Sequence, residues 1–184
     1  MGTRNFLSAL FITVIGASLF AFIEPILPLH ATRFLQTTSS SIGLMFGAAT
    51  LTGLIFFPLA GILSDRTSVQ RVLLVGIIIA ALSYTGIALA NSAWSLTASM
   101  IVLAVGGTFI LAPTTNLIGK MAETIEPPAY GSAYSLYNVS YSIGLAVAPM
   151  LSGLLNGLTS FLVTCLIRSG LMLLCEVLIF SYKK

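Results

Sequence analysis

The sequence predicts an all-α membrane protein with six transmembrane helices. Of its 184 residues, 57% are hydrophobic and only 7% are charged, and the mean hydropathy is +1.04. A typical soluble domain is about 25% charged, so this chain lacks the polar surface of a cytosolic enzyme, a disordered segment or a nucleic-acid-binding protein. Its 8 lysines and arginines are scattered along the chain. No basic patch for phosphate groups results, and we expect no nucleic-acid partner.

Six apolar runs approach or exceed the length of about 20 residues that crosses the hydrocarbon core of a bilayer. The predicted spans are residues 6–29, 42–63, 72–89, 94–118, 132–155 and 158–182. Short polar segments separate them, so we expect one six-helix bundle without a soluble domain. The first run is too long for the core of a signal peptide, and no small-residue cleavage site follows it. We interpret it as a membrane helix.

Basic residues concentrate on one side of this bundle. If the N-terminus is cytoplasmic, Arg33 alone lies outside. The residues on the cytoplasmic side are then Arg4, Arg66, Arg71, Lys120, Lys183 and Lys184. This asymmetry follows the positive-inside rule and predicts that both termini are cytoplasmic.

Small residues in two predicted helices indicate close helix packing. The second helix carries Gly43 and Gly47 in a Gly-x-x-x-Gly pattern, and the fifth carries Gly144 and Ala148 followed by Pro149. Such residues allow two helix backbones to approach closely in a membrane. Packing of this kind is common to membrane bundles, so the pattern does not decide the function.

Three charged residues fall within the predicted spans, where ionisable groups are costly and indicate functional sites by default. With a rise of about 1.5 Å per residue, Glu24 lies about 7 Å and Arg168 about 10–15 Å from the outer ends of their helices. One interpretation is an intramembrane ion pair between them. The other is that Glu24 faces a water-filled cavity and binds a cation or a proton. Glu176 lies nearer the inner surface, within reach of Lys183 or water.

The fifth predicted helix has a polar and aromatic face. Four residues follow the i, i+3, i+4, i+7 spacing of one helical face, namely Tyr134, Tyr137, Asn138 and Tyr141. Phenols and an amide are costly in contact with lipid. The face therefore lines either a packing seam between helices or a cavity wall, where aromatic rings attract organic cations. With Glu24, and with Thr108 and Thr115 of the fourth helix, it makes up the predicted substrate and coupling site.

Enzyme signatures are missing from the sequence. It contains no Gly-x-Ser-x-Gly and no His-Glu-x-x-His, and its single histidine, His30, lies at the outer mouth of the first span. The Asn-Pro-Ala loops of an aquaporin-like channel do not occur either. We therefore predict a protein that is not an enzyme and that has no cofactor or metal site.

Three stretches match motifs of one transporter family. Residues 24–29 read EPILPL, residues 61–66 read GILSDR with Arg71 following, and residues 130–149 run from YGSAY to GLAVAP. Together they resemble the major facilitator superfamily, in its branch of drug:proton antiporters and vesicular amine transporters. The first stretch is similar to a Glu-Pro-x-Leu-Pro sequence in the seventh helix. The second is similar to the Gly-x-Leu-x-Asp-Arg loop, and the third to the eleventh helix with its antiporter-like Gly-Pro pattern.

The resemblance implies half of a two-part transporter. That superfamily consists of two six-helix halves with the substrate site between them near the midplane, and the six spans here resemble helices seven to twelve. Amine transporters carry aspartates where this chain has Asn138 and Leu111, so Glu24 remains as the main carboxylate for coupling. The loop also departs from its signature at residues 68–70, which weakens the expected gating interactions.

The resemblance thus implies a secondary transporter, or half of one, that moves a small organic, cationic or drug-like solute by alternating access. Spans one, two, four and five would line its cavity. The cytoplasmic gate would consist of Gly61, Asp65, Arg66 and Arg71. The expected partners are the bilayer of a plasma or vesicle membrane, the solute, protons, and a second six-helix half or a second copy of this chain. The alternative is a non-transporting membrane subunit or a truncated transporter fragment.

Overall fold

A computed structural model describes residues 3–125 and 127–181, with side chains within 6–125 and 127–175, as a bundle of α-helices. The helices are α1 (Thr3–Ile23), α2 (Leu27–Phe34), α3 (Ser39–Arg66), α4 (Val69–Ala88), α5 (Ala93–Glu123), α6 (Tyr130–Leu158) and α7 (Phe161–Ser181). Five stretches, with α1 and α2 counted together, are long and apolar enough to cross a membrane, and α7 adds a shorter described apolar segment. The all-α membrane fold that the composition predicts is confirmed.

The first predicted span is broken rather than continuous. Helix α1 ends at Ile23, because Pro25 has no N–H group with which to continue the helical hydrogen-bond pattern. The N–H of Glu24 still donates to the carbonyl of Phe20 at 3.0 Å. Residues 24–26 then form a turn, and α2 begins with Pro28 in its first turn. The acidic side chain therefore lies at an interruption of the helix.

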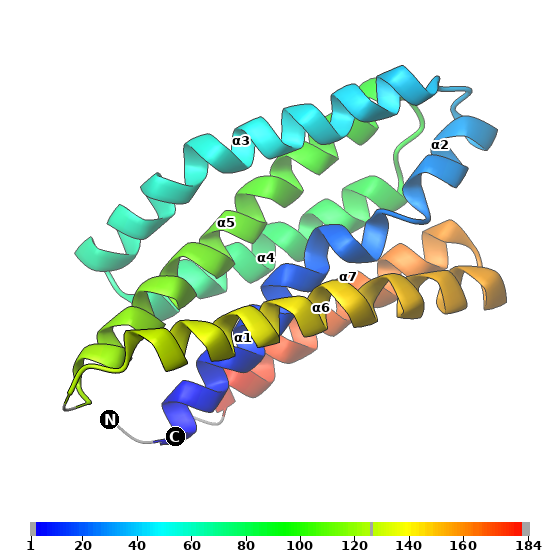
Figure 1. Cartoon of the computed structure of the whole chain (residues 1–184). Coiled ribbons are helices and arrows are strands. Elements are labelled where there is room, and N and C mark those ends of the chain that lie inside the picture. The colour runs from blue at the N-terminus through cyan, green and yellow to red at the C-terminus, as the bar shows by residue number, and fades with distance from the viewer. Residues whose placement is uncertain (1–2, 126, 182–184) are drawn as a thin grey trace.

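Helix α2 is held against the start of α7 by stacked rings. The His30 ring lies nearly parallel to that of Phe161, with 3.9 Å between the centroids, and stacks on Phe34 at 4.9 Å. His30 thus takes part in an aromatic contact between α2 and α7. Figure 1 shows α2 at the end of the bundle opposite the start of α1.

Hydroxyl caps begin α3, α4 and α5. The Ser68 hydroxyl accepts the N–H of Arg71 at 3.3 Å and starts α4, and Ser92 with Ser95 forms a capping box at the start of α5. Each cap satisfies an N–H group that has no partner inside its own helix. Helices α3, α5 and α6 extend beyond the predicted apolar spans at both ends, because polar residues continue the helix past the hydrocarbon core.

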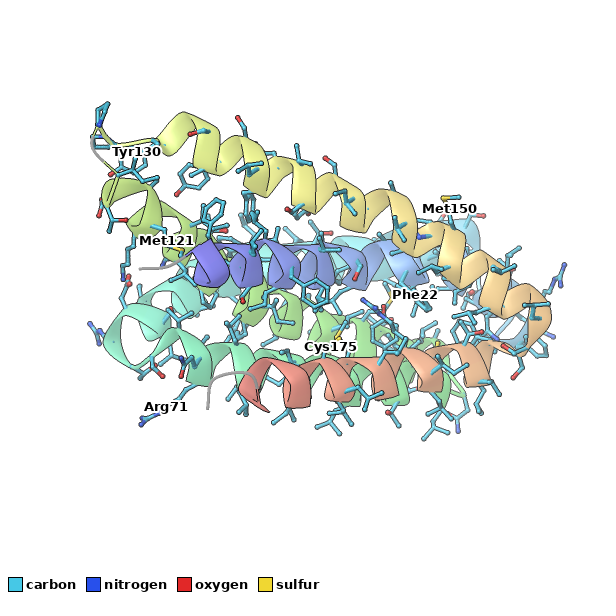
Figure 2. The ribbon with its side chains drawn as sticks, turned by 90° about the horizontal axis from the view of Figure 1, so that it is seen from below. Phe22, Arg71, Met121, Tyr130, Met150 and Cys175 are labelled. Carbon is cyan, nitrogen blue, oxygen red and sulfur yellow. The ribbon has the colours of Figure 1, made fainter. Side chains whose placement is uncertain are left out.

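The helices form two layers. In the first, α6 packs on α1, α1 on α5, and α5 on α3; α4 lies behind α5 and packs on α7. Figure 1 shows α3 along one side of the bundle and α6 and α7 along the other. In Figure 2 α6 and α7 lie on opposite sides of α1. The four helices of the first layer are the four that the sequence predicts to line a cavity.

Glycines bring the central helices into backbone contact. A Cβ atom built on Gly144 would lie 2.6 Å from the carbonyl oxygen of Val14, where α6 crosses α1. One built on Gly106 would lie 2.8 Å from the backbone nitrogen of Ala80, where α5 meets α4. Such distances exclude any side chain, so these crossings depend on glycine. Pro149, five residues beyond Gly144, also lies inside α6.

Gly43 and Gly47 make no such contact inside the chain. A Cβ atom on either residue would meet no atom within 4 Å. The reason is the position of α3 at the edge of the bundle, where only 17% of its apolar span is buried, against 22% for α6 and 50% or more for the other spans. The packing expected of this Gly-x-x-x-Gly pattern is therefore absent within the described residues, and the two glycines lie on an open helix face.

We expect Gly144→Ala to destabilise the bundle by about 1–3 kcal/mol, because the new methyl group would force α1 and α6 apart. Thermal unfolding in detergent micelles measures the effect. Gly153→Ala on the same helix is the matched control, since a Cβ atom there meets nothing within 4 Å; its unfolding temperature should stay level or rise slightly. Equal unfolding temperatures for the two variants would contradict the close α1–α6 contact.

Candidate functional site

The candidate site begins at Glu24, in the turn between α1 and α2. Its side chain is exposed, while Phe22 and Ile23 before it and Ile26 after it are buried. The buried apolar neighbours hold the turn against the bundle. Pro25 prevents the helix from continuing through Glu24. Among the described residues the carboxylate has no ion-pair partner. It is therefore a free acceptor at a helix interruption, available to a proton or a cationic group.

Arg168 does not pair with Glu24. Its guanidinium donates to the hydroxyl of Ser18 and lies over two aromatic rings, 5.1 Å from the centroid of Phe22 and 5.9 Å from that of Tyr84. Ser18 and Phe22 lie on the inward face of α1 before the break, whereas Glu24 lies beyond it. Arg168 of α7 thus finds its partners on α1 and α4, and the ion pair that the matching depths suggested is not formed in this structure.

Tyr84 completes this buried cluster. It is fully buried, its hydroxyl donates to the Leu19 carbonyl of α1, and its ring meets that of Phe22 edge-on at 6.1 Å. Figure 2 shows the Phe22 side chain between α1 and α7. Cation–π contacts and a hydrogen bond to Ser18 therefore stabilise the charge of the half-buried Arg168.

The tyrosines of α6 form a ladder along the seam with α5. Ring centroids are 6.5 Å apart for Tyr134 and Tyr137 and 6.2 Å apart for Tyr137 and Tyr141. The Thr115 hydroxyl of α5 lies 2.8 Å from the Leu111 carbonyl of its own helix and 3.2 Å from the Tyr137 hydroxyl, within hydrogen-bonding distance of both. All three rings are half-buried, so one edge of the ladder packs in the bundle and the other remains open.

Asn138 lies on a different part of α6 from the tyrosines. Its side chain is exposed and lines an open concavity of about 460 Å³ along the helix with Val139, Ser142, Ile143 and Ala146. The single face that the spacing predicts is thus divided into an aromatic part toward α5 and an amide part on the open side.

Thr108 lies apart from the other predicted site residues. It is 7% exposed, and its hydroxyl donates to the Val105 carbonyl of its own helix at 2.8 Å. Its methyl group faces Gly53 of α3. The residue serves the contact between α5 and α3, and the structure does not bring it together with Glu24 or with the tyrosine ladder.

An ion pair joins two helices at the end of the bundle where α1 begins. The Lys120 ammonium near the end of α5 donates to Asp65 near the end of α3 at 2.8 Å. Arg66 and Arg71 of the predicted gate are exposed and have no ion pair in the described part of the chain. Gly61, one turn before Asp65, packs against Asn116 at an ordinary distance.

Sequence reasoning missed Lys120 as a site residue, although it placed this lysine on the same side as Asp65. A second polar contact at this end, from the Tyr130 hydroxyl to Glu123 at 2.8 Å, was also not anticipated. The available signal was the position of Lys120 and Glu123 in the last turns of α5, which must end beside the end of α3 if both helices cross the same membrane.

Comparison with known proteins agrees with this architecture. The family model described as Major Facilitator Superfamily matches residues 6–184. The tetracycline resistance protein, class H, of Pasteurella multocida is 25% identical over 182 residues, covering 96% of this chain and 44% of that protein. The multidrug resistance protein MdtH of Proteus mirabilis is 28% identical over 83% of this chain and 38% of its own length.

An amine transporter is also similar. The chromaffin granule amine transporter of Rattus norvegicus is 23% identical over 141 residues, which cover 77% of this chain and 27% of that protein. The chain therefore spans less than half the length of each of these curated relatives.

We expect Arg168→Lys to lower the free energy of unfolding by about 1–2 kcal/mol. The compact ammonium keeps the charge but loses the planar stacking on two rings and the reach to Ser18. Arg33→Lys, an exposed change of the same kind, is the control and should leave stability unchanged. Thermal unfolding of both variants in the same detergent decides the matter, and equal stabilities would refute a structural role for the stacked guanidinium.

Proposed function

This chain belongs to the Major Facilitator Superfamily, and we propose that it forms one six-helix half of a secondary transporter. The solute would be small and organic, with a cationic or drug-like structure, and would move by alternating access. One observation carries the proposal: the layer α6–α1–α5–α3 exposes a carboxylate at the break after α1 and, beside the first half of α1, an aromatic and amide-bearing face of α6. The chain is an integral, multi-pass membrane protein.

The proposed cavity lies on the open side of this layer. The half-buried rings of Tyr134, Tyr137 and Tyr141 offer faces that attract organic cations, and Asn138 supplies a neutral hydrogen-bonding group beside the concavity on α6. The names of the relatives refer to tetracycline, to several drugs and to amines. Solutes of this kind combine an apolar body with a protonated or polar group, which suits the same lining.

In the proposal, Glu24 couples solute movement to a proton or holds the cationic group of the solute. Its carboxylate is exposed and unpaired in the described residues. The positions of Asn138 and Leu111 hold no carboxylate, so Glu24 would be the main carboxylate for coupling. The sequence contains no nucleophile or zinc motif, and we assign the protein no enzymatic reaction.

A second six-helix body would cover the open faces of α3 and α6, either another chain or a second copy of this one. These two helices bury the smallest share of their apolar spans, and Gly43 and Gly47 offer a flat surface for a facing helix. Under the positive-inside rule, the end with Arg66, Arg71 and Lys120 is cytoplasmic. Arg4, Lys183 and Lys184, which strengthen this assignment, lie outside the described side chains, as does Glu176.

Uptake into proteoliposomes tests the function directly. The solutes are a labelled organic amine and tetracycline, and the uptake of each is measured in the presence and in the absence of a pH gradient. We expect gradient-dependent flux that Glu24→Gln abolishes or makes independent of pH, because an amide cannot exchange a proton. Glu123→Gln, which removes an exposed carboxylate at the other end of the bundle, should retain pH-dependent flux.

Two outcomes would count against the proposal. Unchanged pH dependence in Glu24→Gln would remove the coupling role. No flux for the chain alone, in its paired form or with a co-expressed second half would favour the alternative of a non-transporting subunit or fragment. The replacement of two family carboxylates by Asn138 and Leu111 supports that alternative.

The gate proposal rests on the ion pair between Asp65 and Lys120. We expect Asp65→Asn and Lys120→Gln each to lower the transport rate several-fold, since either change removes the contact that closes the ends of α3 and α5. The charge-swapped double variant, Asp65→Lys with Lys120→Asp, should recover much of the loss. A double variant no better than the single ones would show that the ion pair is not the interaction that matters.

A further inference from the structure

A narrow groove opens at the end of the bundle that carries the Asp65–Lys120 ion pair. It has a volume of about 190 Å³ and lies between the α3–α4 turn, the start of α4 and the middle of α5. Its lining residues are Leu63, Thr67, Arg71, Val72, Val75 and Phe109. The volume is below the roughly 300–1,000 Å³ typical of clefts for drug-sized ligands, and the groove lies outside the proposed solute cavity.

The walls of this groove are apolar apart from its mouth. The Thr67 hydroxyl donates to the Leu63 carbonyl at 2.7 Å, so its hydrogen is already used. Val75 is 42% exposed, and Leu63 is 40% exposed. Side chains of this kind, open to the outside of a membrane helix, suit the hydrocarbon chain of a lipid better than a water-soluble ligand.

Positive charge lies at the mouth. Figure 2 shows Arg71 directed away from the bundle, and Arg66 is exposed five residues earlier. Of the acidic groups at this end within the described residues, Asp65 is paired with Lys120, and Glu123 accepts the Tyr130 hydroxyl. Neither forms an ion pair with Arg66 or Arg71.

The start of α4 adds to this charge. Arg71 lies in its first turn, which contains no acidic residue. The positive end of the helix dipole therefore favours an anion beside Arg71, which forms no ion pair with the described side chains. An apolar groove with a cationic mouth matches one molecule abundant around it, a phospholipid with net negative charge.

We infer that this groove binds an anionic phospholipid of the cytoplasmic leaflet, with part of an acyl chain against Val75 and Phe109 and the phosphate at Arg71. The leaflet follows from the cationic end, which the positive-inside rule places in the cytoplasm, where anionic lipids attract basic residues. The inference does not depend on transport, and it stands or fails independently of the solute site.

The test is binding to the purified full chain in detergent, followed by native mass spectrometry and by the shift in unfolding temperature. The probes are phosphatidylglycerol, phosphatidylcholine with the same acyl chains, and glycerophosphoglycerol, the headgroup without chains. We expect binding and thermal protection by phosphatidylglycerol alone. Arg71→Gln should weaken that binding by about fivefold, the usual effect of one basic residue near an anionic surface.

Two matched controls make the test specific. Arg33→Gln removes an exposed arginine from the other end of the bundle and should bind phosphatidylglycerol normally. Val75→Trp should fill the groove and abolish protection, whereas Leu82→Trp, at a 66% exposed position on the same helix, should not. Because both tryptophans are on the lipid-facing surface of α4, both variants should fold, and circular dichroism checks this.

Each remaining outcome overturns the proposal. Equal protection by phosphatidylcholine would mean that charge plays no part, and protection by the free headgroup would identify an anion site without a lipid. Normal binding to Val75→Trp would show that the acyl chain lies elsewhere. If Val75→Trp fails to fold, Val75→Phe serves as the groove-filling variant under the same criteria.

Discussion

Direct contact between helix backbones is the constraint on which the rest of this structure depends. In a bilayer, apolar side chains gain little by leaving lipid for protein, so helices associate through close van der Waals packing and hydrogen bonds. Gly144 lets α6 rest on α1, and Gly106 lets α5 rest on α4. These crossings place α1 and α5 at the centre of the bundle. The helix break at Glu24 and the seam beside Tyr137 therefore lie on the best-anchored helices.

Polar groups inside the bundle form their hydrogen bonds within the protein, because the hydrocarbon core of the bilayer offers no water to bond with them. Thr108 and Thr115 return their hydroxyl hydrogens to carbonyls of their own helix. Arg168, which has no such partner, is stabilised by Ser18 and by the faces of two aromatic rings. Glu24 differs from all of these, since its carboxylate remains exposed at an interrupted helix. Within the described residues, that contrast separates groups held by packing contacts from an exposed carboxylate without an ion pair.

The two ends of the bundle also differ in kind. At one end the Asp65–Lys120 ion pair, the unpaired Arg71 and the apolar groove beside Val75 occur together around the α3–α4 turn. At the other, His30 stacks on Phe161, and that contact is aromatic rather than ionic. More of the described charged side chains thus lie at the first end, and the turn between α3 and α4 is adjacent to both the ion pair and the groove.

By itself the sequence determined the solvent and the class of fold, because a 7% charged chain needs lipid. It predicted one continuous first span, which the structure divides at Pro25 into α1 and α2. Periodicity also placed the tyrosines on one side of α6. Tertiary structure alone decided that Asn138 faces the open side, that Arg168 meets Ser18 150 residues away, and that Lys120 meets Asp65 across 55 residues. The reason is geometric. A sequence pattern states the angle of a residue around its own helix, but the residue opposite depends on which helices become neighbours and at what depth they cross.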